Sequence, residues 1–273
     1  MLNRIRTLST AVILAMIPAA TVWGQTPAIN KGGILNAASF AIGQPLAPGS
    51  LIAIFGSGFG PLAQADSIPL ATTLANVSVS IGGIKAPLSF VSDGQINAEI
   101  PWEVASTGSV NVIVTRNGNP SGAEPIAVNP VSPGVFAFNG HALAIIATDP
   151  ADPRYGSLAA PSGSIAGLTT FPARAKDALI VYANGLGPVS PAPQTGNNSS
   201  DGTLRRTTTD LTVLIGNLPS QVIFSGLSPQ YVGVYQVNVF VPQASAGNAI
   251  PIQMQTGGFT SAASAANIAI SAQ

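Results

Sequence analysis

The chain has 273 residues, enough for two domains of ordinary size, and 46% of them are apolar while only 7% are charged. This composition excludes disorder driven by charge, because disordered chains are polar and highly charged. The formal net charge is zero and no long basic run occurs, so we expect no nucleic-acid partner. Cysteine is absent, which excludes disulfides and thiolate metal sites.

The first 24 residues have the layout of a secretory signal peptide. Arg4 and Arg6 precede an apolar stretch at residues 8–20, and small or modest residues lie ahead of Gln25. The stretch is short for a membrane span and no comparable run follows it; an uncleaved anchor is the alternative. We therefore expect a secreted protein, extracellular or at the cell surface, with the periplasm as a further option and no membrane span after cleavage.

Short strands separated by turns are expected along the rest of the chain. Val77, Val79 and Ile81 alternate with serines, which is typical of a strand with one buried and one wet face. Asn139-Gly140 is typical of a two-residue hairpin turn. The expected strands are residues 33–40, 51–55, 77–81, 88–91, 96–100, 110–115, 126–129, 135–138, 142–147, 178–182, 211–215, 221–224, 235–241, 250–255 and 267–270.

Three sequence blocks occur twice in the same order. Residues 58–61, 77–82 and 95–101 return as residues 185–188, 211–216 and 236–242. The offsets are 127, 134 and 141 residues, so each loop between blocks is seven residues longer in the second copy. Insertions of this kind suit surface loops on a fixed scaffold. An ordered repeat indicates one folding unit copied in tandem.

Proline and glycine restrict the fold class. The 23 prolines and 29 glycines leave little room for helices, and many short strands are typical of β-sandwiches, with barrels as the alternative. We predict an all-β fold of two tandem immunoglobulin-like β-sandwich domains. Residues 25–32 are expected to be a leader, residues 33–130 the first domain and residues 131–273 the second, with an insertion at residues 149–175.

Exposed loops are the expected place of any recognition surface. We expect such loops at residues 62–74, 149–175 and 195–209, of which the second has no match in the first unit. The two tyrosines among the candidates suit a glycan or a partner protein, with packing at a core or edge as the alternative. The candidate ligand contacts are Asp149, Asp152, Arg154, Tyr155 and Tyr231.

Calcium is the metal to consider at this insertion. Asp149 and Asp152 would supply oxygens there, with Asp201 and Asp210 as further donors. Calcium usually takes about six to eight oxygen ligands from a denser acidic loop, and Asp before Pro is a frequent turn former. We therefore expect a solvated loop, no metal and no cofactor.

Two polar pairs recur at equivalent places in the repeat. Gln95 and Asn97 return as Gln236 and Asn238, two residues apart on an expected strand. Side chains at this spacing share one face, where they form either a polar ligand strip or a structural pair. Because half-buried amides need hydrogen-bond partners, we favour a structural role in which each amide satisfies backbone groups of the neighbouring glycine turn.

The run Gly56-Ser57-Gly58-Phe59-Gly60 and the single histidine, His141, invite a catalytic interpretation. The run departs from a nucleophile elbow, which needs Gly-x-Ser-x-Gly, and is one residue short of a dinucleotide loop. His141 follows the Asn139-Gly140 turn, which favours an exposed hairpin position. We expect no catalytic residue; a small extracellular hydrolase centred on Ser57, His141 or Asp149 is the alternative.

The repeated blocks resemble the IPT/TIG type of immunoglobulin-like domain, in which an apolar strand runs into a glycine-rich turn. The motifs at residues 36–40, 48–50, 56–61, 95–103, 184–188 and 233–242 together resemble more closely an uncharacterised C-terminal domain family of secreted acidobacterial (Solibacter-type) proteins. This resemblance covers nearly the whole chain after the signal peptide. It implies an extracellular tandem of IPT/TIG-like β-sandwiches and no particular activity.

These observations predict a secreted, non-catalytic binding or structural module. It would act in cell-surface adhesion, envelope organisation or protein and glycan recognition through its loops. Its partner would be a protein or glycan at the cell surface. The alternatives are the small hydrolase and a self-assembling surface or fibre subunit, because low charge and many apolar strands favour edge pairing and self-association.

Overall fold

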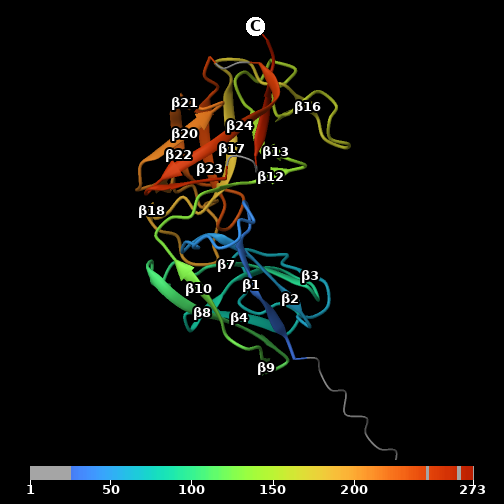
Figure 1. Cartoon of the computed structure of the whole chain (residues 1–273), viewed down its shortest axis with the longest axis vertical. Helices are drawn as coiled ribbons and strands as arrows, with labels where there is room; N and C mark the ends of the chain where they lie inside the picture. The colour runs from blue at the N-terminus through green and yellow to red at the C-terminus, as the bar shows by residue number, and fades with distance from the viewer. Residues whose placement is uncertain (1–25, 244–245, 263–265, 273) are drawn as a thin grey trace, which may run out of the picture.

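The computed structural model describes residues 26–243, 246–262 and 266–272, so the predicted signal peptide lies outside the described residues. Every regular element in these ranges is a β-strand, and among them no helix is long and apolar enough to cross a membrane. The predicted all-β fold is confirmed. Two β-sandwiches are stacked end to end along the long axis of the molecule (Figure 1).

The first sandwich has two antiparallel sheets. One has the strand order β1-β2-β7-β6-β3, and the other has the order β10-β8-β4-β5 with β9 paired to β8. The strands are β1 (Ala28–Asn36), β2 (Leu51–Ser57), β3 (Ala63–Gln64), β4 (Val77–Ile81), β5 (Ile84–Ala86), β6 (Leu88–Val91), β7 (Gln95–Glu99), β8 (Gly108–Arg116), β9 (Asn119–Pro120) and β10 (Glu124–Val128).

The second sandwich also has two sheets, which are mostly antiparallel and carry extra edge strands. Its sheets have the orders β16-β15-β14-β17-β23-β22-β19-β18, with β11 on β17, and β12-β13-β26-β24-β20-β21, with β25 on β24. The strands are β11 (Gly134–Val135), β12 (Ala137–Phe138), β13 (His141–Ala142), β14 (Ala144–Ile146), β15 (Leu158–Ala159), β16 (Thr170–Phe171), β17 (Ala178–Asn184), β18 (Val189–Ser190), β19 (Arg206–Thr207), β20 (Leu211–Ile215), β21 (Leu218–Ser220), β22 (Val222–Leu227), β23 (Tyr235–Phe240), β24 (Gly247–Thr256), β25 (Phe259–Thr260) and β26 (Asn267–Ile270).

The sequence repeat is a repeat of strand order. The run β2-β7-β6 returns as β17-β23-β22, and the run β8-β4-β5 returns as β24-β20-β21. Equivalent turns also have equivalent backbones: Gly82 and Gly83 have positive φ between β4 and β5, as do Gly216 and Asn217 between β20 and β21. Glycine and asparagine tolerate this conformation, which suits two-residue hairpins. The hairpin predicted at Asn139-Gly140 is confirmed, since Phe138 pairs with His141.

Each sandwich has its own apolar core, formed by the inward faces of its two sheets. In β4 the alternation holds as predicted: Val77, Val79 and Ile81 are fully buried while the serines between them are half-buried. The largest buried side chain of the second core is Tyr235, whose hydroxyl donates a hydrogen bond to the carbonyl of Gly187. This bond satisfies the one polar group of a fully buried ring.

The expected leader contains part of a strand. Strand β1 begins at Ala28 rather than at Gly33, and Ala28 and Ile29 pair with Ser57 and Gly56 of β2. The register shifts between Ile29 and Ile34. No sequence pattern indicated this extension, because residues 28–32 are mostly exposed and lack the apolar alternation of a half-buried strand.

Residues 149–175 were expected to form an exposed loop, and the structure agrees only in part, since about half of the segment is exposed. The segment adds β15 and β16 to the edge of a sheet, and Leu158, Ala160 and Ile165 form a small buried cluster there. Leu143 and Ile145 pack against the cluster. Small residues such as alanine pack closely between neighbouring strands, so a segment rich in them is not necessarily solvated.

Candidate binding groove at the junction of the sandwiches

Asn184, the last residue of β17, joins the two sandwiches. Its side chain is fully buried. The Nδ2 group donates to the carbonyl of Leu51 at 2.7 Å and to Oδ1 of Asn36 at 2.9 Å, and Oδ1 accepts from the Leu51 N–H at 3.0 Å. Asn36 in turn donates to the carbonyl of Ser132 at 2.8 Å. This network satisfies buried polar groups on both sides, so it fixes how the sandwiches meet.

Glu99, the last residue of β7, forms a second connection. Its carboxyl is fully buried, and Oε2 accepts a hydrogen bond from the Gly196 N–H of the second sandwich at 2.6 Å. Its Oε1 has no hydrogen-bond partner among the described residues. Burial raises the pKa of Glu99 to about 8; the Gly196 N–H and the Trp102 side chain lower it and Glu103 raises it. The carboxyl is therefore mostly protonated at neutral pH.

Trp102 comes from the first sandwich but packs against the core of the second. Its ring fills the space over Gly49, where any Cβ would overlap it. The Trp102 backbone N–H donates to Oγ1 of Thr195 at 3.1 Å, and that hydroxyl donates to Oε2 of Glu103 at 2.7 Å. The loop around Thr195 was expected to be exposed; part of it is instead held at the junction by these contacts.

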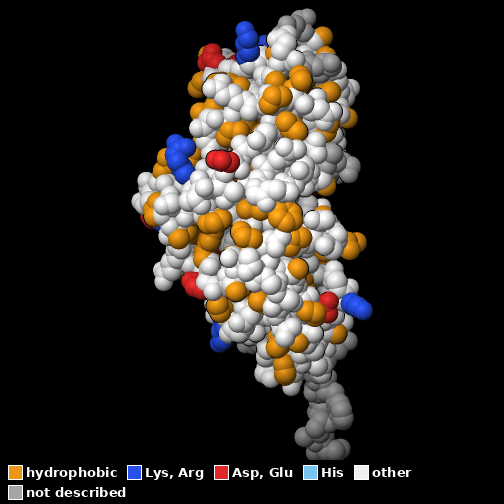
Figure 2. All heavy atoms as spheres, turned by 60° about the vertical axis from the view of Figure 1, so that its left-hand side comes forward, with side chains coloured by type: hydrophobic (Ala, Val, Ile, Leu, Met, Phe, Trp, Pro, Cys, Tyr) orange, Lys and Arg blue, Asp and Glu red, His pale blue; other side chains and the backbone are white. Residues whose placement is uncertain are grey.

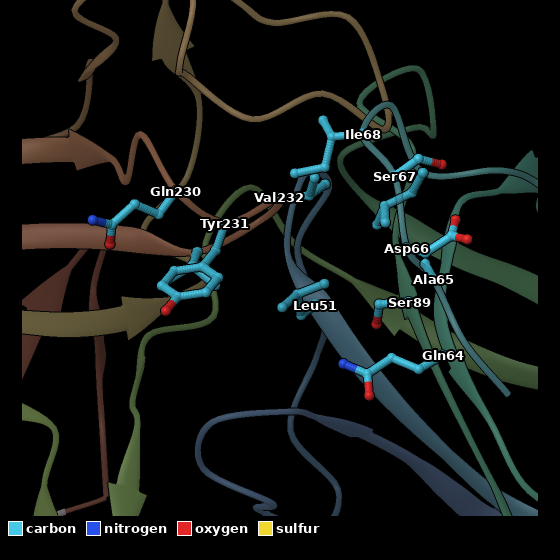
Figure 3. Close-up of a pocket in the computed structure, with 12 residues that line it drawn as sticks. Leu51, Gln64, Ala65, Asp66, Ser67, Ile68, Ser89, Gln230, Tyr231 and Val232 are labelled. Atoms are coloured by element: carbon cyan, nitrogen blue, oxygen red, sulfur yellow. The ribbon is translucent and has the colours of Figure 1, made fainter. Parts of the chain in front are cut away.

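An open groove of about 580 Å³ lies beside these contacts. Figure 3 shows the Tyr231 ring and Gln230 on one side of Leu51, and Gln64 and Asp66 on the other. The Tyr231 ring meets the ring of Tyr182 edge to face, with centroids 6.2 Å apart and an angle of 83° between the planes. This contact orients Tyr231, which stays 55% exposed. The groove therefore has one wall from each sandwich.

Of the predicted ligand contacts, only Tyr231 lies in this groove. Tyr155 is 48% exposed, but it belongs to the insertion in the second sandwich. Asp149 is exposed and accepts a hydrogen bond from the Ala151 N–H, as in a local turn. The structure does not bring Tyr231 together with the candidates of the insertion.

Arg154, a predicted ligand contact, is buried and offers little surface to a ligand. Its side chain is 8% exposed and bridges two carboxylates, Asp152 at 2.7 Å and Asp177 at 2.6 Å. The hydrogen bonds from Arg154 lower the pKa of Asp152. The Arg154 guanidinium and the two carboxylates therefore pair with one another inside the protein, and these pairs tie the insertion to the start of β17.

The two polar pairs are hydrogen-bonded within themselves. Nε2 of Gln95 donates to Oδ1 of Asn97 at 2.7 Å, and Nε2 of Gln236 donates to Oδ1 of Asn238 at 2.9 Å. The partner of each Gln amide is thus the neighbouring Asn, rather than backbone of a glycine turn as predicted. Gln236 and Asn238 also line a hollow of about 370 Å³ on the second sandwich.

The residues of the hydrolase alternative are dispersed. Ser57 ends β2 in the first sandwich, where it pairs with Ala28. His141 lies in β13 of the second sandwich, paired with Phe138 and Asn267. Within the described ranges, no group of three or more His, Asp or Glu residues is arranged to hold a metal ion.

The residues that build the junction, Asn184, Glu99 and Trp102, were missed as functional residues by the sequence reasoning. A signal was present in the repeat itself. Glu99 occupies the place of Phe240 in the second copy, and Asn184 the place of Ser57 in the first. A carboxyl in an apolar strand is unusual enough to indicate a contact that its counterpart lacks.

Residues 39–128 match the model of the IPT/TIG domain, so an IPT/TIG domain is found in the first sandwich. The resemblance to the acidobacterial C-terminal family and the domain bounds taken from the repeat stay predictions. Among curated proteins, none is significantly similar to this chain in sequence.

Several solved structures are similar to the chain at low identity. SGBP-B from a mixed-linkage glucan utilization locus of Bacteroides ovatus, in complex with a mixed-linkage heptasaccharide, is 14% identical with a TM-score of 0.33; the match covers 83% of this chain and 42% of that one. SGBP-B from a xyloglucan utilization locus of Bacteroides uniformis is 12% identical with a TM-score of 0.26, covering 89% and 49%. Domains 5–6 of the S-layer protein SbsC are 12% identical with a TM-score of 0.26, covering 89% and 98%. This chain spans less than half the length of either SGBP-B chain, and similarity at this level does not extend to function.

Proposed function

We propose that the protein is a secreted, non-catalytic recognition module that binds a protein or glycan at the cell surface through the junction groove. The observation that carries this proposal is Tyr231, an exposed aromatic ring in a concave, mainly apolar site (Figure 3). Exposed aromatic side chains in hollows that also contain a few polar groups are typical of binding sites. Adhesion and envelope organisation are the roles that suit such a module.

The fixed junction supports this proposal. The walls of the groove belong to different sandwiches, and the buried contacts of Asn184 and Glu99 hold them in one arrangement. A site whose walls are already in place loses little conformational entropy when it binds. Secretion and a surface location rest on the predicted signal peptide at residues 1–24.

Tyr231→Ala tests the proposal, with Tyr155→Ala as the matched control, because both rings are about half exposed and only Tyr231 lies in the groove. The binding material is envelope and secreted polymer from the organism that makes the protein. We expect Tyr231→Ala to weaken binding at least about tenfold and Tyr155→Ala to leave it unchanged. Equal binding by wild type and Tyr231→Ala, or no binding by wild type, would overturn the proposal.

A further inference from the structure

A second hollow adjoins the groove. It has a volume of about 390 Å³, and Ile68 lines both spaces. The two are also linked by a hydrogen bond, since Nδ2 of Asn198 in the second hollow donates to the carbonyl of Gln230 in the groove at 3.4 Å. Together they form an extended concave surface across the junction, interrupted by the Ile68 side chain, which is 45% exposed.

Side-chain amides are the most frequent polar groups in the lining of this surface. Gln64 and Gln230 lie in the groove, and Gln194, Asn197 and Asn198 lie in the second hollow. An amide offers both donors and acceptors. Hydroxyl groups have the same dual character, so a row of amides matches a polyhydroxylated ligand better than an ionic one.

Net charge on this surface is low. In the second hollow, the carboxylate of Asp201 and the guanidinium of Arg205 form a 2.7 Å ion pair and compensate each other. Asp66 is the other charged residue among those that line the two spaces. Figure 2 shows that charged side chains are few on the face of the molecule in view. A strongly charged ligand would therefore find little compensation.

We propose that the two hollows bind a neutral oligosaccharide chain that crosses Ile68, with one sugar stacked on Tyr231 and others hydrogen-bonded by the amides of the second hollow. Aromatic rings suit the apolar C–H faces of sugars, while the amides pair with their hydroxyls. This inference rests on the proposed function and makes it specific, because it selects glycan over protein and neutral over acidic glycan.

The experiment uses extracellular polysaccharide of the producing organism, separated by anion exchange into neutral and acidic fractions. Binding of the full mature protein is measured by affinity electrophoresis in gels that contain each fraction. We expect retardation by the neutral fraction that periodate, which cleaves vicinal diols, abolishes and protease does not. Tyr231→Ala should weaken this binding at least about tenfold.

Asn197→Ala tests the second hollow, with Asn119→Ala in the exposed β8–β9 hairpin as control. We expect Asn197→Ala to weaken the binding of long chains about fivefold to tenfold and to leave the binding of short acid-released fragments unchanged. Asn119→Ala should change the binding of neither. Equal loss for short and long chains would overturn the two-hollow arrangement.

The other outcomes separate this inference from the proposed function. If the acidic fraction alone binds, or if protease alone abolishes Tyr231-dependent binding to whole envelope, the neutral-glycan inference fails and the recognition function stands. If no fraction and no envelope material binds, both fail. Thermal melting of each variant shows whether a lost interaction reflects the surface or a loss of fold.

Discussion

The two sandwiches share one strand order, yet some equivalent positions differ in burial. In each such pair, one residue lies at the junction between the sandwiches and the other lies at a free end. Ser57 ends β2 and is exposed, whereas Asn184 ends β17 and is fully buried against Leu51. Glu99 is fully buried at the junction, whereas Phe240, which pairs with Ala178 as Glu99 pairs with Leu51, is 37% exposed.

A third pair follows the same rule. Gly49 and Lys176 have φ of 72° and 73°, and their N–H groups donate to the equivalent carbonyls of Ile100 and Val241. The Trp102 ring leaves no room for a side chain at Gly49, whereas Lys176 is exposed. The repeat therefore diverges where one copy touches the other, and the difference between copies identifies the junction.

The largest expected effect comes from the pH dependence of Glu99. Its pKa is raised in the folded state to about 8 from an ordinary value near 4.5. The free energy of unfolding is therefore highest below the ordinary pKa, where Glu99 is protonated in both states, and it falls as pH rises through 8. The loss is at most about 5 kcal/mol. Urea unfolding at several pH values measures it.

Glu99→Gln should remove this dependence, because an amide has nearly the shape of the protonated acid and cannot ionise. The matched control is Glu103→Gln, which changes an exposed carboxyl next to the same loop. Because the Glu103 charge raises the pKa of Glu99, this variant should keep the pH dependence with its midpoint shifted slightly to lower pH. Equal slopes for wild type and Glu99→Gln between pH 5 and 9 would contradict a buried, protonated Glu99.

Asn184→Ala is expected to have the next largest effect. It leaves the Leu51 N–H without its hydrogen-bond partner and removes one donor each from the Leu51 carbonyl and the Asn36 side-chain oxygen, at a cost of about 2 to 4 kcal/mol. Ser57→Ala, at the equivalent exposed position, should change the free energy of unfolding by less than about 0.5 kcal/mol. Chemical denaturation compares them, and similar losses in both variants would break the comparison between the copies.

A smaller difference is expected at the third pair. Gly49→Ala forces a Cβ into the Trp102 ring and should cost about 1 to 3 kcal/mol. Lys176→Ala places the same Cβ at the same φ in an exposed turn and should be nearly neutral, within about 0.5 kcal/mol. Melting temperatures of the two variants decide the point; a harmless Gly49→Ala would mean that Trp102 moves freely at the junction.

Features that depend on neighbouring residues in the chain were predictable from the sequence. The hairpin at Asn139-Gly140 follows from two residues that tolerate positive φ, and the burial of Val77, Val79 and Ile81 follows from their alternation. The loop at residues 62–74 was expected to be exposed, and most of its residues are.

Features that depend on how distant segments meet were not predictable in this way. The groove needs Tyr231 opposite Gln64, and no local pattern links the two residues. The burial of part of the insertion was missed because its composition was taken as a sign of exposure. Arg154 is buried there because it pairs with two carboxylates. The positions at which the two copies of the repeat differ were nevertheless a usable signal of the junction between the sandwiches.

The end-to-end stacking of the sandwiches has a consequence for polymerisation. A head-to-tail contact between like units leaves each free end ready for another unit, and such contacts extend into filaments when they do not close. Here the outer end of the second sandwich has Lys176 and Phe240 where the first sandwich has Gly49 and Glu99. That end lacks the carboxyl that accepts a backbone N–H at the junction, so it does not repeat the contacts that join the two sandwiches.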